Sequence, residues 1–339
     1  MLDPWNQSKS QSPDSLRLPR EQHLKNIRQL TFGGLNAEAY FSFDETKLIF
    51  QSTRDSFRCD QIFMMNVNGS QVKLLSTGKG RTTCAYFLPD GAHFLYASTH
   101  LGGAECPPAP DRKKGYVWSL YPSYDIFIAD TNGNIIRRLT ETPGYDAEAV
   151  VSPQGDKIAF TSLRNGDLDI YTMNLDGSDV RQLTHEFGYD GGPFFSADGK
   201  KIVYRAYHPN TQSELNEYKD LLAEEKIKPM SLQIFVMDAD GSHKVQITHN
   251  TSANFAPFIH PDGKHIIFAS NMGDTSHSPM DFDLYVIGTD GNGLQSITFH
   301  QGFDGFPMFS RDAKKLVFSS SRNGKSRYEI NIFIADWVP

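Results

Sequence analysis

Two histidines and one glutamate are the residues of this chain best suited to acid–base or metal chemistry. His100 and His208 stand at a repeated position where three of the other four segments carry Arg, and Glu148 lies between them in the sequence. Two imidazoles beside a carboxylate can hold a divalent metal ion or move protons near neutral pH. The pattern predicts a metal or acid–base site made of His100, Glu148 and His208. The alternative is that these residues only stabilise the loops that carry them.

A second group of residues is suited to binding an anion or a sugar. Guanidinium groups bind carboxylates in a fork, and aromatic faces stack on sugars. The competing interpretation is that the arginines form structural ion pairs with Asp55 and Asp60, and that Asp190 satisfies loop amides. The candidates for ligand binding, beside the three residues above, are Arg54, Arg58, Arg81, Trp118, Tyr189 and Asp190.

These residues are positioned by repeats of one unit. Residues 145–184 contain four predicted strands, with a Pro-Gln-Gly turn at 153–155 and a hairpin signal at Asp176-Gly177. A period of roughly 40–50 residues with four strands per unit is typical of a β-propeller. The alternating third strand recurs as DQIFMMN, YDIFIAD, LDIYTMN, LQIFVMD, FDLYVIG and INIFIAD, which predicts an all-β fold of six four-stranded antiparallel blades.

The sixth unit has no fourth strand before the last residue, Pro339. Residues 27–32 match a fourth strand and precede every first strand, so we expect them to pair with residues 330–337 and close the ring. The propeller is then one domain over residues 23–339. Residues 1–22 are polar and rich in Ser and Pro, and we expect a disordered segment there.

Two insertions interrupt the repeats. Residues 99–123 lie between the second and third strands of blade two, and residues 213–228 of blade four read as an amphipathic helix. Because both leave from the same type of loop, we expect them on one face of the ring, meeting over blade three.

Three cysteines are predicted on that same face. In an oxidising compartment Cys106 can bridge to Cys59 or to Cys84, which would fasten the blade-two insertion and leave one thiol. The alternative is three separate buried thiols.

Composition excludes some partners. The net charge of −7 argues against nucleic acid, and no apolar run is long enough for a membrane span. Residues 1–20 lack the apolar core of a signal peptide. We therefore expect a periplasmic or secreted protein if a leader has been removed, and otherwise a cytoplasmic one.

The repeated turn, the D-I-Y/F strand and the R-x-L-T return strand resemble the TolB-like six-bladed propellers, built of WD-like repeats. The stretches ECPPAPDRKKGYVW and GYDGGPFFS are similar to an exported bacterial subfamily that lacks the N-terminal domain of TolB. Because that domain is missing, the role of TolB itself is not carried over. Together with the arginines and aromatic residues named above, the propeller fold predicts non-catalytic binding of a protein, a glycan or an anion at the mouth of the channel.

An enzymatic alternative stays open beside the binding function. It is a metal-dependent lyase or hydrolase acting on a small anionic or carbohydrate substrate, for which a propeller lyase of oligogalacturonides is the precedent, although its ligand motif is absent here. The sequence contains no G-x-S-x-G motif, which excludes the hydrolase activity of prolyl-oligopeptidase-like enzymes.

Overall fold

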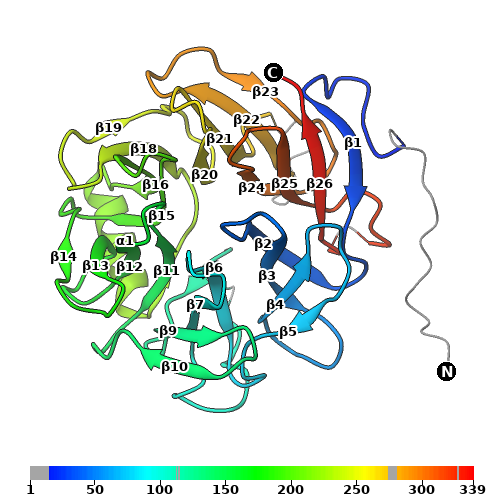
Figure 1. Cartoon of the computed structure of the whole chain (residues 1–339). Coiled ribbons are helices and arrows are strands. Elements are labelled where there is room, and N and C mark those ends of the chain that lie inside the picture. The colour runs from blue at the N-terminus through cyan, green and yellow to red at the C-terminus, as the bar shows by residue number, and fades with distance from the viewer. Residues whose placement is uncertain (1–14, 112, 114, 274–280, 327) are drawn as a thin grey trace.

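The structure is a computed structural model that describes residues 15–111, 113, 115–273, 281–326 and 328–339. Six four-stranded antiparallel sheets surround a central axis as the blades of a propeller (Figure 1). The predicted fold class is therefore confirmed. No helix in the described ranges is long and apolar enough to cross a membrane.

Each blade runs from an innermost first strand to an outer fourth strand. The strands of blades one to three are β2 (Leu35–Phe41), β3 (Lys47–Thr53), β4 (Gln61–Asn66) and β5 (Lys73–Leu74); β6 (Thr82–Phe87), β7 (His93–Ser98), β9 (Asp125–Asp130) and β10 (Ile135–Arg138); and β11 (Asp146–Val151), β12 (Lys157–Ser162), β13 (Asp169–Asn174) and β14 (Arg181–Gln182). Those of blades four to six are β15 (Tyr189–Phe195), β16 (Lys201–Tyr207), β18 (Gln233–Asp238) and β19 (Val245–Gln246); β20 (Asn254–Ile259), β21 (His265–Ser270), β22 (Asp283–Gly288) and β23 (Gln295–Ser296); and β24 (Asp304–Phe309), β25 (Lys315–Ser320), β26 (Asn331–Trp337) and β1 (Leu24–Gln29).

One pair of aromatic residues recurs in the core of every blade. A ring on the second strand contacts a ring on the third, with centroids between 5.5 and 6.0 Å apart. Such contacts add to the stabilisation from burying the apolar area. The pairs are Phe50–Phe63, Tyr96–Phe127, Phe160–Tyr171, Tyr204–Phe235, Phe268–Tyr285 and Phe318–Phe333.

The two ends of the chain close the ring in blade six. Strand β1 pairs antiparallel with β26, from Leu24 opposite Trp337 to Gln29 opposite Phe333 (Figure 1). The expected closure is present, although β1 begins three residues earlier than predicted. The structure also describes residues 15–22 of the predicted disordered segment, where Glu21 is fully buried and ion-paired with Arg322. The rest of the predicted disordered segment, residues 1–14, lies outside the described residues.

The two insertions meet over blade three, as predicted. Strand β8 (Trp118–Ser119) of the blade-two insertion pairs with β17 (Lys226–Ile227) of the blade-four insertion. Helix α1 (Gln212–Ala223) is capped by Thr211 and is tied to blade three by a 2.6 Å hydrogen bond from the Tyr218 hydroxyl to Asp167. The helix is shorter than predicted because the residues after it form β17.

A disulfide fastens the blade-two insertion to blade one. Cys59 and Cys106 are bonded, with their Cα atoms 5.9 Å apart, and Cys84 is a free thiol. This is one of the two pairings that the sequence left open. We call the end of the ring that carries α1, β8 and β17 the insertion face, and the opposite end, where turns join first to second strands, the turn face.

Candidate functional site

The innermost strand of every blade bulges at an equivalent position. The register between first and second strands shifts there in all six blades, and the bulge residue has φ between 49° and 59°. Non-glycine residues adopt this conformation at a cost of about 1–3 kcal/mol, and such strain clusters at functional sites. A bulge also re-aims the side chain. From blade one to blade six, the bulge residues are Glu38, Cys84, Glu148, Gly192, Ala256 and Phe306.

Glu148 forms the centre of a polar network that joins blades three and four. Its Oε2 accepts hydrogen bonds from Thr161 Oγ1 at 2.7 Å and from the Gly192 N–H at 2.8 Å, and its Oε1 accepts one from Arg205 Nη2. Arg205 Nε also donates to the Tyr189 hydroxyl at 2.8 Å. The side chains of Glu148 and Arg205 are only 11% and 10% exposed, so the pair is shielded from water.

Glu38 is a second carboxyl beside this network. Loss of hydration raises the pKa of Glu38 from 4.5 to about 7, although a hydrogen bond from Cys84 and the charge of Arg205 oppose the change. Burial, together with the charges of Glu38 and Glu148, raises the pKa of the Cys84 thiol well above its usual value. The thiol is therefore a proton donor to Glu38 and not a thiolate nucleophile. We call Glu38, Cys84, Glu148, Tyr189 and Arg205 the axial cluster.

Trp118 covers the axial cluster from the insertion face. The Arg205 guanidinium lies 5.2 Å from the centre of its ring, and the Tyr189 ring meets it edge-on at 6.5 Å. The pairing of β8 with β17 and the disulfide on the same insertion hold Trp118 in place. Glu38, Cys84, Glu148 and Trp118 all keep some exposed surface, so a ligand can contact them.

The structure does not bring the expected metal ligands together. Glu148 lies in the axial cluster, whereas the His100 ring contacts Phe127 and its Nδ1 lies 2.9 Å from Ser98 Oγ. His208 Nε2 lies 3.0 Å from Asp190. Within the described residues, no group of three or more His, Cys, Asp and Glu side chains is arranged to hold a metal ion. These residues therefore do not fit the divalent metal that the sequence suggested.

His208 has the structural role that arginine has in other blades. Arg164 pairs with Asp146 at 3.0 Å, and His208 pairs in the same way with Asp190. Burial disfavours the charged imidazole, but the hydrogen bond and the charge of Asp190 outweigh it, so the pKa of His208 is raised. For His100, burial lowers the pKa, and the charge of Lys79 adds to the effect.

The candidate arginines have structural partners or lie on the surface. Arg81 pairs with Asp60 at 2.9 Å, and Arg54 lies 3.9 Å from Asp55. These are the ion pairs of the competing interpretation. Arg58 is exposed. Among the expected ligand-binding residues, only Trp118, Glu148 and Tyr189 come together at the axis.

Sequence reasoning missed Arg205 as a site residue. It stands in strand β16, at a position where the other second strands carry Gln51, Ala97, Thr161, Ala269 or Ser319. A lone arginine in an otherwise apolar strand needs a buried partner, and this was the signal that could have found it.

Comparisons with known proteins agree with the architecture. Residues 109–226 match the family model described as the TolB beta propeller domain. No curated protein sequence matches the chain. The family match and the six blades confirm the resemblance to TolB-like propellers.

Solved structures with the same fold include both TolB proteins and an enzyme. A putative TolB from Agrobacterium tumefaciens has a TM-score of 0.59 and 20% identity, over 90% of this chain and 91% of that one. TolB from Acinetobacter baumannii has a TM-score of 0.57 and 18% identity, over 80% of this chain and 56% of that one. Oligogalacturonate lyase from Vibrio parahaemolyticus has a TM-score of 0.52 and 14% identity, over 94% of this chain and 95% of that one. At these identities the likeness concerns the fold alone.

Proposed function

We propose that this TolB-like six-bladed propeller is a binding protein that holds an uncharged glycan at the axial cluster. The observation that carries the proposal is the division of the bulge ring into two halves. Blades one to three contribute Glu38, Cys84 and Glu148, whereas blades four to six contribute Gly192, Ala256 and Phe306. A sugar ring has hydroxyl groups at its edges and C–H groups on its faces, so it matches a site with one polar and one apolar side.

The charges of the site favour a neutral glycan over an anion. Arg205 is neutralised by Glu148, and Arg81 by Asp60. Carboxylates accept hydrogen bonds from hydroxyl groups, and the partly exposed ring of Trp118 offers a stacking face. An anionic ligand would meet the carboxylate of Glu148 and the carboxyl group of Glu38, and the arginine of the cluster, Arg205, is already paired with Glu148.

Glycan binding can be measured with an array of neutral and uronic-acid oligosaccharides, followed by titration of the hits. Trp118→Ala should abolish binding of neutral glycans, and Glu148→Gln should weaken it about tenfold, which corresponds to about 1.4 kcal/mol. Arg58→Gln, an exposed charge on the same face, is the matched control. If wild type prefers uronic acids and Arg81→Gln loses that preference, the result would support an anionic ligand instead. Absence of any glycan signal would refute the proposal and leave a protein partner as the ligand class to test.

One observation favours an enzyme as the second candidate. Glu38, with a pKa of about 7, can exchange a proton at neutral pH, and it lies beside a second carboxylate, Glu148. A general acid or base works best when its pKa is near the operating pH. If the protein is a hydrolase of the same glycan, product should form with wild type, and Glu38→Gln should bind the glycan without forming product.

The disulfide supports the expectation that the protein works in the periplasm or is secreted. Disulfides persist in oxidising compartments and are rare in the cytoplasm. Mass spectrometry of protein isolated from its native cells under non-reducing conditions should find Cys59 and Cys106 joined. Free thiols at both positions would argue for a cytoplasmic protein.

A further inference from the structure

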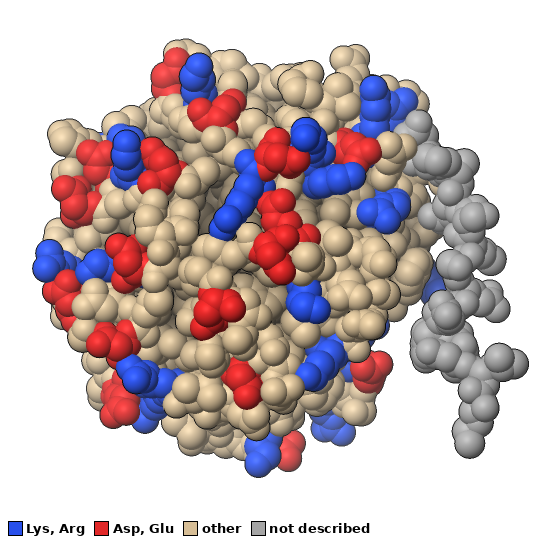
Figure 2. Space-filling model, in the orientation of Figure 1, with Lys and Arg blue, Asp and Glu red and all other residues tan. Residues whose placement is uncertain are grey.

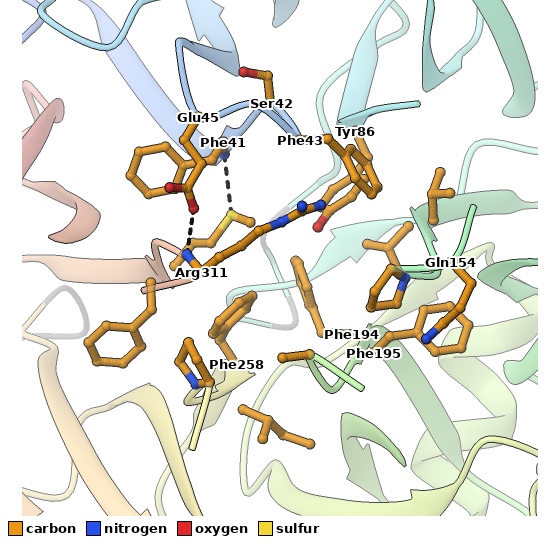
Figure 3. Close-up of a pocket in the computed structure, with 18 residues that line it drawn as sticks. Phe41, Ser42, Phe43, Glu45, Tyr86, Gln154, Phe194, Phe195, Phe258 and Arg311 are labelled. Atoms are coloured by element: carbon orange, nitrogen blue, oxygen red, sulfur yellow. Dashed lines mark hydrogen bonds between the residues drawn. The ribbon is translucent and has the colours of Figure 1, made fainter. Parts of the chain in front are cut away.

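The turn face carries a pocket that is separate from the axial cluster. Figure 2 shows a hollow at the centre of one face of the ring, with a basic side chain reaching over it. The pocket of Figure 3 has a volume of about 440 Å³ and is lined by the ends of first strands and the turns that follow them. Its volume is within the range of small-molecule sites, about 300–1,000 Å³. Its aromatic lining includes Phe41, Phe43, Tyr86, Phe194, Phe258 and Phe309.

The aromatic residues at the floor of the pocket separate it from the insertion face. Tyr86 contacts Phe194 with ring centroids 6.3 Å apart, and Phe194 contacts Phe258 at 5.8 Å. Tyr40, which is buried on β2, contacts both Tyr86 and Phe194. Because these residues follow the bulge residues along the first strands, they lie between the pocket and the axial cluster. A ligand in this pocket would not touch Glu38 or Glu148.

One basic side chain crosses this aromatic pocket. Arg311 extends over the pocket towards Phe43 and Tyr86 (Figure 3), and its guanidinium lies 4.9 Å from the centre of the Phe43 ring. Among the residues that the structure describes, it forms no ion pair and no side-chain hydrogen bond. The hydroxyl of Tyr86 likewise has no hydrogen-bond partner in the described part of the chain.

The acidic residue in the lining of the pocket, Glu45, does not pair with the Arg311 guanidinium. Glu45 lies at the rim, and its carboxylate accepts a hydrogen bond from the main-chain N–H of Arg311, not from the guanidinium (Figure 3). The pocket therefore presents two hydrogen-bond donors, the Arg311 guanidinium and the Tyr86 hydroxyl, above an apolar floor. A few convergent polar groups within aromatic walls are typical of a small-molecule site.

We propose that this pocket binds a small monocarboxylate with an aromatic body, whose carboxylate pairs with Arg311 and Tyr86. The guanidinium fork matches the geometry of a carboxylate, and the phenol adds a second donor. The aromatic body of the ligand replaces water against the phenylalanine rings, which supplies hydrophobic stabilisation. This site is independent of the proposed glycan site, because it lies at the opposite end of the ring.

The test uses 3-phenylpropanoate as the probe, with its amide and 3-phenylpropylamine as uncharged and cationic counterparts. Binding to the full chain is measured by ligand-observed NMR and calorimetry. We expect 3-phenylpropanoate to bind at least tenfold more tightly than the amide and the amine. Added salt should weaken the binding of the carboxylate and leave the binding of the other two compounds unchanged.

Variants separate the pocket from nonspecific binding. Arg311→Gln should weaken 3-phenylpropanoate about tenfold and Tyr86→Phe about threefold, whereas neither should change the weak binding of the amide. Lys314→Gln, an exposed cation of the same turn, should leave the affinity unchanged. Equal affinities for acid and amide, an unchanged affinity in Arg311→Gln, or no binding of the acid would overturn the proposal. Melting curves of each variant show that a loss of binding is not a loss of folding.

Discussion

Replacing Glu38 by Gln should make the protein more stable at pH 8 and hardly change it near pH 4.5. Loss of hydration raises the pKa of Glu38 from 4.5 to about 7 in the folded protein. The folded state therefore holds a proton that the unfolded state releases between these pH values. By linkage, the stabilisation from the protonated carboxyl is fully present below pH 4.5 and is lost as the pH rises through about 7.

The size of the effect follows from the shift in pKa. One unit corresponds to about 1.4 kcal/mol, so the full difference would be about 3 kcal/mol. Glu38 keeps some exposed surface, and solvent screening reduces the figure to about 2 kcal/mol. Glutamine keeps the shape of the protonated acid and does not titrate. Glu38→Gln should thus gain about 2 kcal/mol over wild type at pH 8.

Urea denaturation of both proteins between pH 4.5 and pH 8 measures this difference directly. Other acidic groups titrate in the same range, since burial also raises the pKa of Asp169 and of Asp283 to about 7. Their contributions cancel when the two curves are subtracted. Glu141→Gln, at an exposed position, controls for the loss of one acidic charge. A difference curve that stays flat across the pH range would refute the reasoning.

Three further changes test the structure. Glu21→Ala should destabilise the protein by about 2 kcal/mol in urea, because it leaves the buried guanidinium of Arg322 with one carboxylate instead of two; an unchanged midpoint would contradict the buried triad. Arg205→Met should cost about 3 kcal/mol because Glu148 loses its partner, and adding Glu148→Gln should recover part of that loss in a double-mutant cycle. Cys106→Ser opens a loop of 47 residues and should cost about 4 kcal/mol. Limited proteolysis should then cut the blade-two insertion, and equal protection would argue against the fastening role.

The repeats could be predicted from the sequence because their signals are local. Alternation in the third strand and the Asp-Gly or Asn-Gly hairpins each depend on a few neighbouring residues. The end of α1 was not predictable in this way. Residues 224–228 continue the helical pattern, but Lys226 and Ile227 pair with β8, more than one hundred positions earlier. A contact between distant insertions overrides local propensity there.

The site was predictable only in part. The sequence pattern singled out Glu148 as a site residue, but the bulge that re-aims its side chain has no local sequence signal. Arg205 is meaningful only once the neighbouring blade supplies a carboxylate. His208 shows the converse. The exchange of Arg for His suggested metal or acid–base chemistry, but in the structure the His208 ring pairs with Asp190, as Arg164 pairs with Asp146 in blade three. Sequence shows which residue type changes, whereas the direction of a side chain depends on packing.

The short sheet of β8 and β17 changes how the ring can come apart. In a propeller, each blade packs mainly on its two neighbours, so disturbances spread from one blade to the next. The pairing of β8 with β17 links blade two directly to blade four and bypasses blade three. Blade three therefore cannot separate from its two neighbours unless the β8–β17 pairing, which joins those neighbours to each other, also breaks. Hydrogen exchange should therefore find blades two to four opening as one cooperative unit, while blades five and six exchange at their own rates.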